Sequence, residues 1–90
     1  MNFSEEQLKE IERMAAMFFT AEEIAVNIEV DAEDFAILIL AKQGPAYMSY
    51  MTGWLKTDVE LRKCILQSAL NGSSPAQQMM KEYQNRARYE

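Results

Sequence analysis

The sequence contains no histidine, one cysteine, three glycines and two prolines in 90 residues. Without histidine the chain lacks the usual general base and the commonest side-chain metal ligand, and a Ser–His or Cys–His nucleophile is excluded. The lone Cys64 excludes an internal disulfide. The acidic run Asp31, Glu33 and Asp34 lacks the spacing and the glycine of a calcium loop. We therefore expect a protein that is not an enzyme and binds no cofactor, metal or small-molecule substrate.

Long apolar runs are missing as well. No stretch approaches the roughly 18 residues that a membrane span needs. The first ten residues, MNFSEEQLKE, are acidic and polar, unlike a signal peptide. These features predict a cytoplasmic protein with no membrane partner.

The scarcity of glycine, proline and β-branched residues predicts an all-α fold. Three short helices are expected to begin after Ser4, Thr20 and Asp31, because each can cap a helix and the first two have Gln7 and Glu23 in capping-box spacing. Gly44-Pro45 ends the third helix. A long helix then runs from Ala46 to Leu70, and a last helix follows Ser74 as its cap, with Pro75 in its first position. The sequence thus predicts about five helices: a tri-helical, helix-turn-helix-like unit over residues 1–43 and a helical hairpin over 44–90, the expected oligomerisation region.

Charge is distributed unevenly along the chain. Residues 1–40 carry ten acidic and two basic side chains, a net charge of −8, whereas residues 41–90 carry seven basic and four acidic ones, +3. Since nucleic-acid binding depends on local basic surface, the second half is the more favourable place for phosphate contacts.

The stretch FTAEEIAVNIEVDAEDF (19–35) has the apolar spacing of a helix-turn-helix, with the small Ala25 available for close helix packing. Glu29 occupies the tight turn, where glycine is usual. Candidate DNA contacts lie on the third helix and on a basic stripe of the long helix. The alternative for the basic stripe is an ordinary solvent-exposed face whose charges pair with Asp58 and Glu60. The candidate DNA contacts are Ala32, Glu33, Lys42, Lys56, Arg62 and Lys63.

Apolar and aromatic residues cover more than one side of the long helix, which a 90-residue monomer can hardly bury. This favours a homo-oligomer in which these side chains form the subunit interface. The alternative for some of them is a place in the core of the monomer. The candidate interface residues are Tyr47, Met51, Trp54, Leu55, Met79, Met80 and Tyr83.

Together the helix-turn-helix stretch and a downstream pattern resemble the terminase small subunits, phage and prophage DNA-packaging proteins. The downstream pattern is Pro45-Ala46-Tyr47, Gly53, Glu60-Leu61-Arg62 and ALNGSSPAQ (69–77). The resemblance implies a non-enzymatic accessory in the bacterial host cell that binds double-stranded DNA as an oligomer and regulates the large terminase subunit. The chain departs from the family in its short C-terminal part and its acidic recognition helix. A second function therefore stays open: a protein–protein interaction or assembly module on a helix-turn-helix scaffold that does not bind DNA directly.

Overall fold

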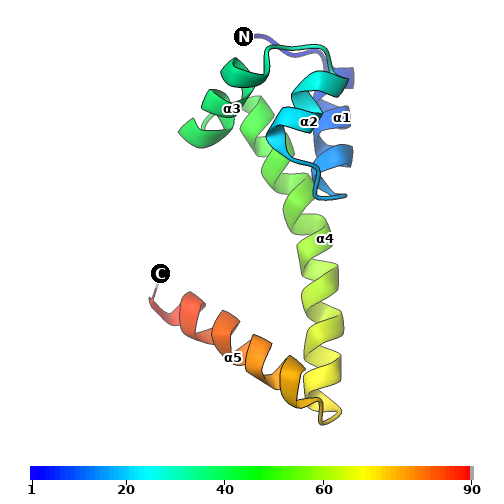
Figure 1. The fold of residues 1–90 in the computed structure, drawn as a ribbon, viewed down its shortest axis with the longest axis vertical. Helices are drawn as coiled ribbons and strands as arrows, with labels where there is room; N and C mark the ends of the chain where they lie inside the picture. The colour runs from blue at the N-terminus through cyan, green and yellow to red at the C-terminus, as the bar shows by residue number, and fades with distance from the viewer. Residues whose placement is uncertain (90) are drawn as a thin grey trace. The chain divides into compact units, whose positions relative to one another are not determined.

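The computed structural model describes residues 1–89, and over that range it contains five α-helices and no strand (Figure 1). The predicted all-α fold of about five helices is therefore confirmed. The helices are α1 (Glu5–Ala15), α2 (Ala21–Asn27), α3 (Ala32–Ala41), α4 (Pro45–Leu70) and α5 (Ser74–Tyr89).

The first three helices begin at the predicted caps. Ser4 Oγ accepts a hydrogen bond from the Gln7 backbone N–H (3.1 Å) while Gln7 Oε1 accepts one from the Ser4 N–H (2.9 Å). Thr20 and Glu23 form the same reciprocal pair at 3.1 and 2.9 Å. Asp31 Oδ1 accepts from the Asp34 N–H at 2.9 Å. These caps satisfy backbone donors that would otherwise lack partners in the first turn, so local chemistry alone sets the three starts.

The predicted cap of the last helix is wrong by one residue. Ser73, not Ser74, caps α5: its Oγ accepts from the Ala76 N–H at 3.3 Å and its carbonyl accepts from the Gln77 N–H at 3.0 Å. The cause is the turn after α4, in which Gly72 (φ +101°) allows the Ser73 N–H to reach the Ser68 carbonyl at 3.0 Å. This turn brings the chain into helix one residue earlier than expected.

The chain forms two compact units, and the boundary between them falls inside α4, between Asp58 and Val59. The sequence predicts the boundary between residues 43 and 44, before this helix. The first part of α4 belongs to the N-terminal unit because Ala46 and Gly53 are buried there. In addition, Thr57 Oγ1 donates a hydrogen bond to the Ala16 carbonyl at 2.5 Å. Unit 1 therefore consists of the three short helices together with the first half of α4.

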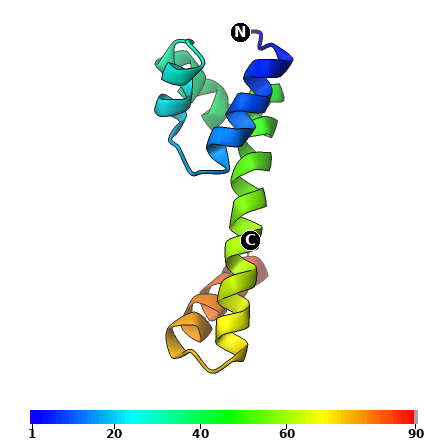
Figure 2. The ribbon, with the colours of Figure 1, turned by 90° about the vertical axis from the view of Figure 1, so that its right-hand side faces the viewer.

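The core of unit 1 is formed by α1, α2 and α3 around the start of α4 (Figures 1 and 2). Five of its side chains are completely buried: Ile11, Ala15, Ile24, Ala25 and Phe35. Phe3, before the first helix, stacks edge-on against Phe35 with ring centroids 6.0 Å apart. Aromatic contacts of this geometry add about 0.5–1.5 kcal/mol to the area buried.

Three turns of unit 1 place non-glycine residues in the left-handed region. Phe18, Glu29 and Lys42 have φ values of +62°, +61° and +57°. Phe18 and Glu29 follow the ends of α1 and α2, and Lys42 directly follows α3. A side chain in this conformation costs about 1–2 kcal/mol, a cost that glycine avoids. The chain has three glycines, and two of them, Gly44 and Gly72, also have positive φ.

Replacing Glu29 with glycine is expected to stabilise unit 1 by about 0.5–1 kcal/mol, because relief of the left-handed strain exceeds the added entropy of the unfolded chain. Urea unfolding followed by circular dichroism measures the effect. Glu22→Gly, inside α2, is the matched control and should instead destabilise by about 1 kcal/mol. A destabilised Glu29→Gly variant would show that the Glu29 side chain makes a contribution larger than the strain.

Gly53, the third glycine, lies inside α4 and has an ordinary helical φ. A Cβ atom at this position would lie 2.0 Å from the Glu12 carbonyl oxygen and 2.8 Å from the Glu12 carbonyl carbon. The backbones of α1 and α4 therefore approach each other here more closely than any side chain permits. The absent side chain of Gly53 is what allows α1 to lie on α4.

Unit 2 consists of the second part of α4 and α5, and its buried apolar residues are small: Ala69 and Ala76. Gln77 Nε2 donates to the Ala69 carbonyl at 3.0 Å. The Arg62 guanidinium lies over the Tyr83 ring, with Cζ 3.9 Å from the ring centroid, and the Arg86 Cζ lies 5.9 Å from the same centroid. Cation–π and alanine contacts thus hold this hairpin, while several large apolar side chains stay exposed. Leu61, Leu66, Leu70 and Met79 are among them.

Candidate nucleic-acid and protein interfaces

The α2–turn–α3 segment has the build of a helix-turn-helix. Ala25 of α2 and Phe35 of α3 are completely buried, and the intervening turn closes with the Val30 N–H donating to the Ala25 carbonyl at 3.0 Å. Glu29 adopts the left-handed conformation that such a turn needs. Residues 1–43 therefore include a packed pair of helices whose second member, α3, presents one face to solvent.

The exposed face of α3 is acidic at its start and apolar further along. Glu33 is exposed in the first turn, Ile37 is 63% exposed and Leu40 is 79% exposed. Since positions 33, 37 and 40 are spaced by four and three residues, they share one face of the helix. Base edges are usually contacted by Arg, Lys, Asn or Gln. The surface of α3 thus fits an apolar partner better than the edges of base pairs.

The structure does not gather the six candidate DNA-binding residues into one patch. Ala32 and Glu33 start α3, whereas Lys42 follows its last residue, about 15 Å away along a helix of this length. Ala32 is also half-buried, while Glu33 and Lys42 are exposed.

Each of the three basic residues on α4 has a neighbour in the structure. Lys56 Nζ lies 2.8 Å from Glu12 Oε2 in unit 1, and Lys63 Nζ lies 3.1 Å from Glu60 Oε1 in unit 2. Arg62 is held over the Tyr83 ring. Both ion pairs are solvent-exposed, so each contributes at most about 1 kcal/mol and leaves its lysine able to exchange the carboxylate for a phosphate.

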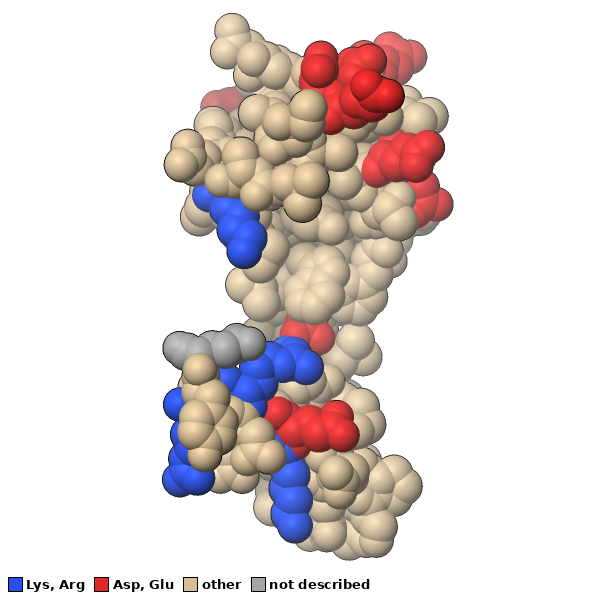
Figure 3. Space-filling model, turned by 60° about the vertical axis from the view of Figure 1, so that its left-hand side comes forward, with Lys and Arg blue, Asp and Glu red and all other residues tan. Residues whose placement is uncertain are grey.

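Acidic and basic side chains are concentrated in different units (Figure 3). Residues 1–58 carry eleven acidic and four basic side chains, a net charge of −7. From Val59 to Tyr89 there are five basic and two acidic side chains, a net charge of +3. The net charge therefore favours phosphate contacts in unit 2 and contacts with a cationic partner in unit 1.

The seven candidate interface residues are divided between the units. Tyr47, Met51 and Trp54 are half-buried on the part of α4 that belongs to unit 1, and the Phe18 ring packs edge-on against Trp54 at 5.2 Å. The neighbouring Leu55 is exposed. In unit 2, Met79 is exposed, Met80 is half-buried and Tyr83 is half-buried beneath Arg62. Leu55 and Met79 are thus the candidates with most apolar surface left for a partner.

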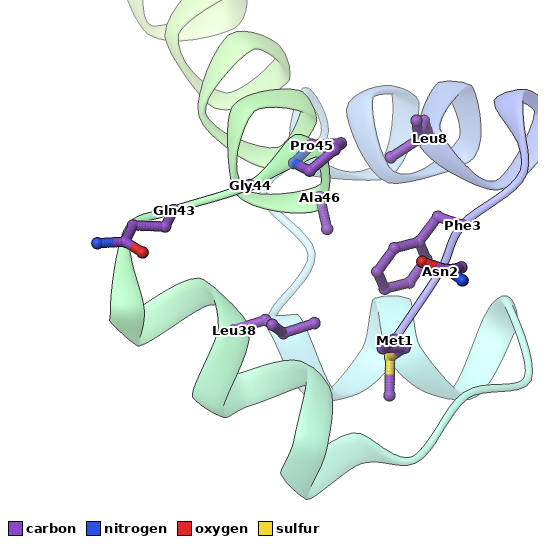
Figure 4. A pocket seen from close by; sticks show the side chains of 9 residues that line it. All are labelled: Met1, Asn2, Phe3, Leu8, Leu38, Gln43, Gly44, Pro45 and Ala46. Carbon is purple, nitrogen blue, oxygen red and sulfur yellow. The ribbon is translucent and has the colours of Figure 1, made fainter.

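A pocket of about 320 Å³ opens between the N-terminal segment, α1, α3 and the start of α4 (Figure 4). Apolar side chains form most of its wall, with Phe3, Leu8, Leu38 and Ala46 among them, and Asn2 and Gln43 supply polar groups. The pocket is at the small end of the range for ligand sites. No acidic or basic side chain and no thiol is among its lining residues.

A second hollow, the α1–α2 groove, has a volume of about 620 Å³ and was not predicted from the sequence. Its lining residues are Arg13, Met14, Met17, Phe19, Glu22, Glu23, Val26 and Asn27. Met17, Phe19 and Val26 are all exposed apolar residues. Phe19 and Val26 are apolar residues that lie outside the buried faces of their segments. Their apolar character at these positions was the one sign of the groove in the sequence.

One ion pair borders the α1–α2 groove. Arg13 Nε donates to Glu10 Oε2 at 3.0 Å, Arg13 Nη2 contacts Glu10 Oε1, and Asn27 Nδ2 donates to Glu10 Oε1 at 3.2 Å. The hydrogen bond from Arg13 lowers the pKa of the Glu10 carboxyl, and the same bond raises the pKa of Arg13. Both groups are therefore charged at neutral pH and neutralise each other. Glu22 and Glu23 leave the groove with a net negative rim.

Within residues 1–89, no group of three or more Cys, Asp or Glu side chains is placed to hold a metal ion. No helix in this range is both long enough and apolar enough to cross a membrane.

No family model matches this sequence, and no curated protein or solved structure matches it either. The fold itself defines the class: an all-α protein with a helix-turn-helix unit and a helical hairpin.

Proposed function

We propose that this protein is a non-enzymatic DNA-packaging accessory of the terminase small-subunit type, which binds double-stranded DNA as a homo-oligomer and regulates a large packaging subunit. The observation that carries the proposal is the combination of a helix-turn-helix unit with a helical hairpin that has several large apolar side chains exposed. The resemblance of residues 19–35 and 45–77 to that family supports the same function.

The hairpin supports assembly into an oligomer. Leu70 is 73% exposed, and Leu61, Leu66 and Met79 are each more than two-fifths exposed. Full burial of one such side chain contributes about 1.5–3 kcal/mol. A second copy of the hairpin is the partner that would bury these residues, in an oligomer closed by symmetry.

The charge distribution supports DNA contact through the phosphate backbone rather than through base edges. The basic residues of α4 and α5 carry the positive charge, whereas α3 has Glu33 and Asp34 in its first turn. In an oligomer the positive residues of each copy would be repeated along one surface. Backbone contacts of this kind bind DNA with little dependence on its sequence.

Titrating the protein with a fluorescent DNA duplex across a salt series is expected to give an affinity that falls by about 0.9 log units per log unit of salt for each phosphate contacted. Replacing Lys56 and Lys63 together with glutamine should reduce that slope by about two. The matched control is Lys9→Gln on α1, which removes an exposed lysine outside the basic stripe and should leave the slope unchanged.

Absence of DNA binding at low salt would overturn the proposed DNA contact. Light scattering of the same samples tests the oligomer separately. A monomer at the concentrations used for the DNA titration would overturn the hairpin interface.

The exposed face of α3 favours a second candidate function, a protein-interaction or assembly module that does not bind DNA. Ile37 and Leu40 lie on one face with Glu33, a surface suited to a partner that is both apolar and basic. A protein that assembles and yet fails to bind duplex DNA at any salt concentration would fit this function.

A further inference from the structure

We propose that the α1–α2 groove is a docking site for a basic amphipathic helix of a protein partner. This groove is a different surface from the hairpin and from the exposed face of α3, and its occupation by a helix does not depend on DNA binding.

The floor of the groove provides apolar contact area. Met14 is buried at its base and receives a contact from Asn27 Nδ2 at 3.2 Å from the sulfur. Met17 and Val26, on either side, are 52% and 68% exposed. Exposed apolar residues that line a common hollow mark a binding surface, whereas isolated ones do not.

The shape of the groove suits a helix. It lies between the end of α1 and α2, so its walls are two helices and the turn that joins them. An amphipathic helix binds such a groove by inserting apolar side chains spaced by three, four and seven residues. Met14 and Met17 add adaptability, because unbranched thioether side chains repack around different anchors.

The charge of the groove indicates that its partner is basic. Glu22 is exposed on the rim, and Glu23 carries its charge there while its carboxylate accepts hydrogen bonds from Thr20. The one basic side chain of the lining, Arg13, is neutralised by Glu10. The net charge of −7 on unit 1 extends the attraction beyond the rim and would speed the approach of a cationic helix.

The probe for this site is a fluorescein-labelled 18-residue helical peptide of leucine and lysine, with a leucine and glutamate peptide of the same apolar pattern as its counterpart. Fluorescence anisotropy is measured with the full-length protein. We expect the lysine peptide to bind at least tenfold more tightly than the glutamate peptide. Glu22→Lys should weaken its binding about tenfold, which corresponds to about 1.4 kcal/mol. Val26→Gln should weaken it by a similar factor.

Two variants in the same unit serve as matched controls. Glu6 occupies the second position of α1, as Glu22 does in α2, and both are exposed, so Glu6→Lys makes the same charge change at the same distance from a helix start. Met48, 60% exposed on α4, is the counterpart of Val26, and Met48→Gln removes a similar apolar surface elsewhere. Both controls should change peptide affinity less than twofold.

Three results would overturn the docking site: equal binding of the two peptides, equal weakening by Glu22→Lys and Glu6→Lys, or unchanged binding to Val26→Gln. Light scattering identifies a different occupant, because loss of oligomers in Val26→Gln would show that a second copy fills the groove. The salt series with duplex DNA, repeated on Val26→Gln, separates this inference from the proposed function, since loss of peptide binding with unchanged DNA binding supports the groove alone.

Discussion

Replacing Gly53 with alanine is expected to lower the free energy of unfolding by about 2–3 kcal/mol, even though alanine is the better helix former. The new Cβ would lie 2.0 Å from the Glu12 carbonyl oxygen and 3.0 Å from the Glu12 Cα, all backbone atoms of α1. No rotation of a flexible side chain can relieve this overlap, so α1 and α4 must separate. Overpacking of a tight core typically costs about 1–3 kcal/mol and occasionally more, and an overlap with fixed backbone atoms is expected to cost about 3–4 kcal/mol. The helix propensity of alanine returns about 1 kcal/mol.

Urea unfolding followed by circular dichroism and by Trp54 fluorescence measures this change. Trp54 follows Gly53 in α4 and packs against Phe18, so its emission should report the separation of the helices directly. Met48→Ala, at an exposed position of the same helix, is the control and should change stability by less than 0.5 kcal/mol, as is usual for surface positions. If Gly53→Ala were as stable as the original protein, the close approach of α1 and α4 would be wrong.

Replacing Phe35 with alanine is expected to cost about 3–5 kcal/mol, the usual range for a buried phenylalanine. Phe35 is completely buried and is among the largest of the fully buried side chains. Its removal leaves a cavity beneath α3 and takes away the edge-on partner of the Phe3 ring. A domain of this size has a total stability of only about 5–13 kcal/mol. This one change therefore removes a large part of it and should melt the helix-turn-helix unit first.

Thermal and urea unfolding measure the loss, with Phe35→Leu as the conservative control. Leucine keeps most of the apolar volume and should cost less than half as much as alanine. Phe3→Ala separates the two contributions, because it removes the ring contact while leaving Phe35 in the core. An unfolding free energy that is unchanged in Phe35→Ala would contradict the assignment of this residue to the core.

The sequence was sufficient to predict the helices of unit 1. Each cap is a contact between residues three positions apart, such as Ser4 with Gln7 and Asp31 with Asp34, so both partners lie within one helical turn of the sequence. The all-α class follows in the same way from composition. The cap of α5 was misplaced by one residue because both Ser73 and Ser74 have the right chemistry, and the turn at Gly72 selects between them.

Surface chemistry was predictable only as a list of residues. The sequence shows that Lys56, Arg62 and Lys63 are basic, but it does not show that their neighbours are Glu12, Tyr83 and Glu60. Two of these partners are 21 or more residues away along the chain, beyond the reach of periodicity. The α1–α2 groove was missed because Met17 and Val26 come together only when α1 and α2 pack.

The sequence alone thus determined the all-α class, the first turns of the three short helices of unit 1 and the uneven distribution of charge, because each depends on composition or on neighbours within one helical turn. The tertiary structure decided where α1 meets α4, which residues accept left-handed turns and where the units divide. Gly53 illustrates the difference. In the sequence it is a residue that could interrupt a long helix, and in the structure it is the point where the backbone of Glu12 leaves no room for a side chain. Only the distance between two segments that are 41 residues apart gives that glycine its role.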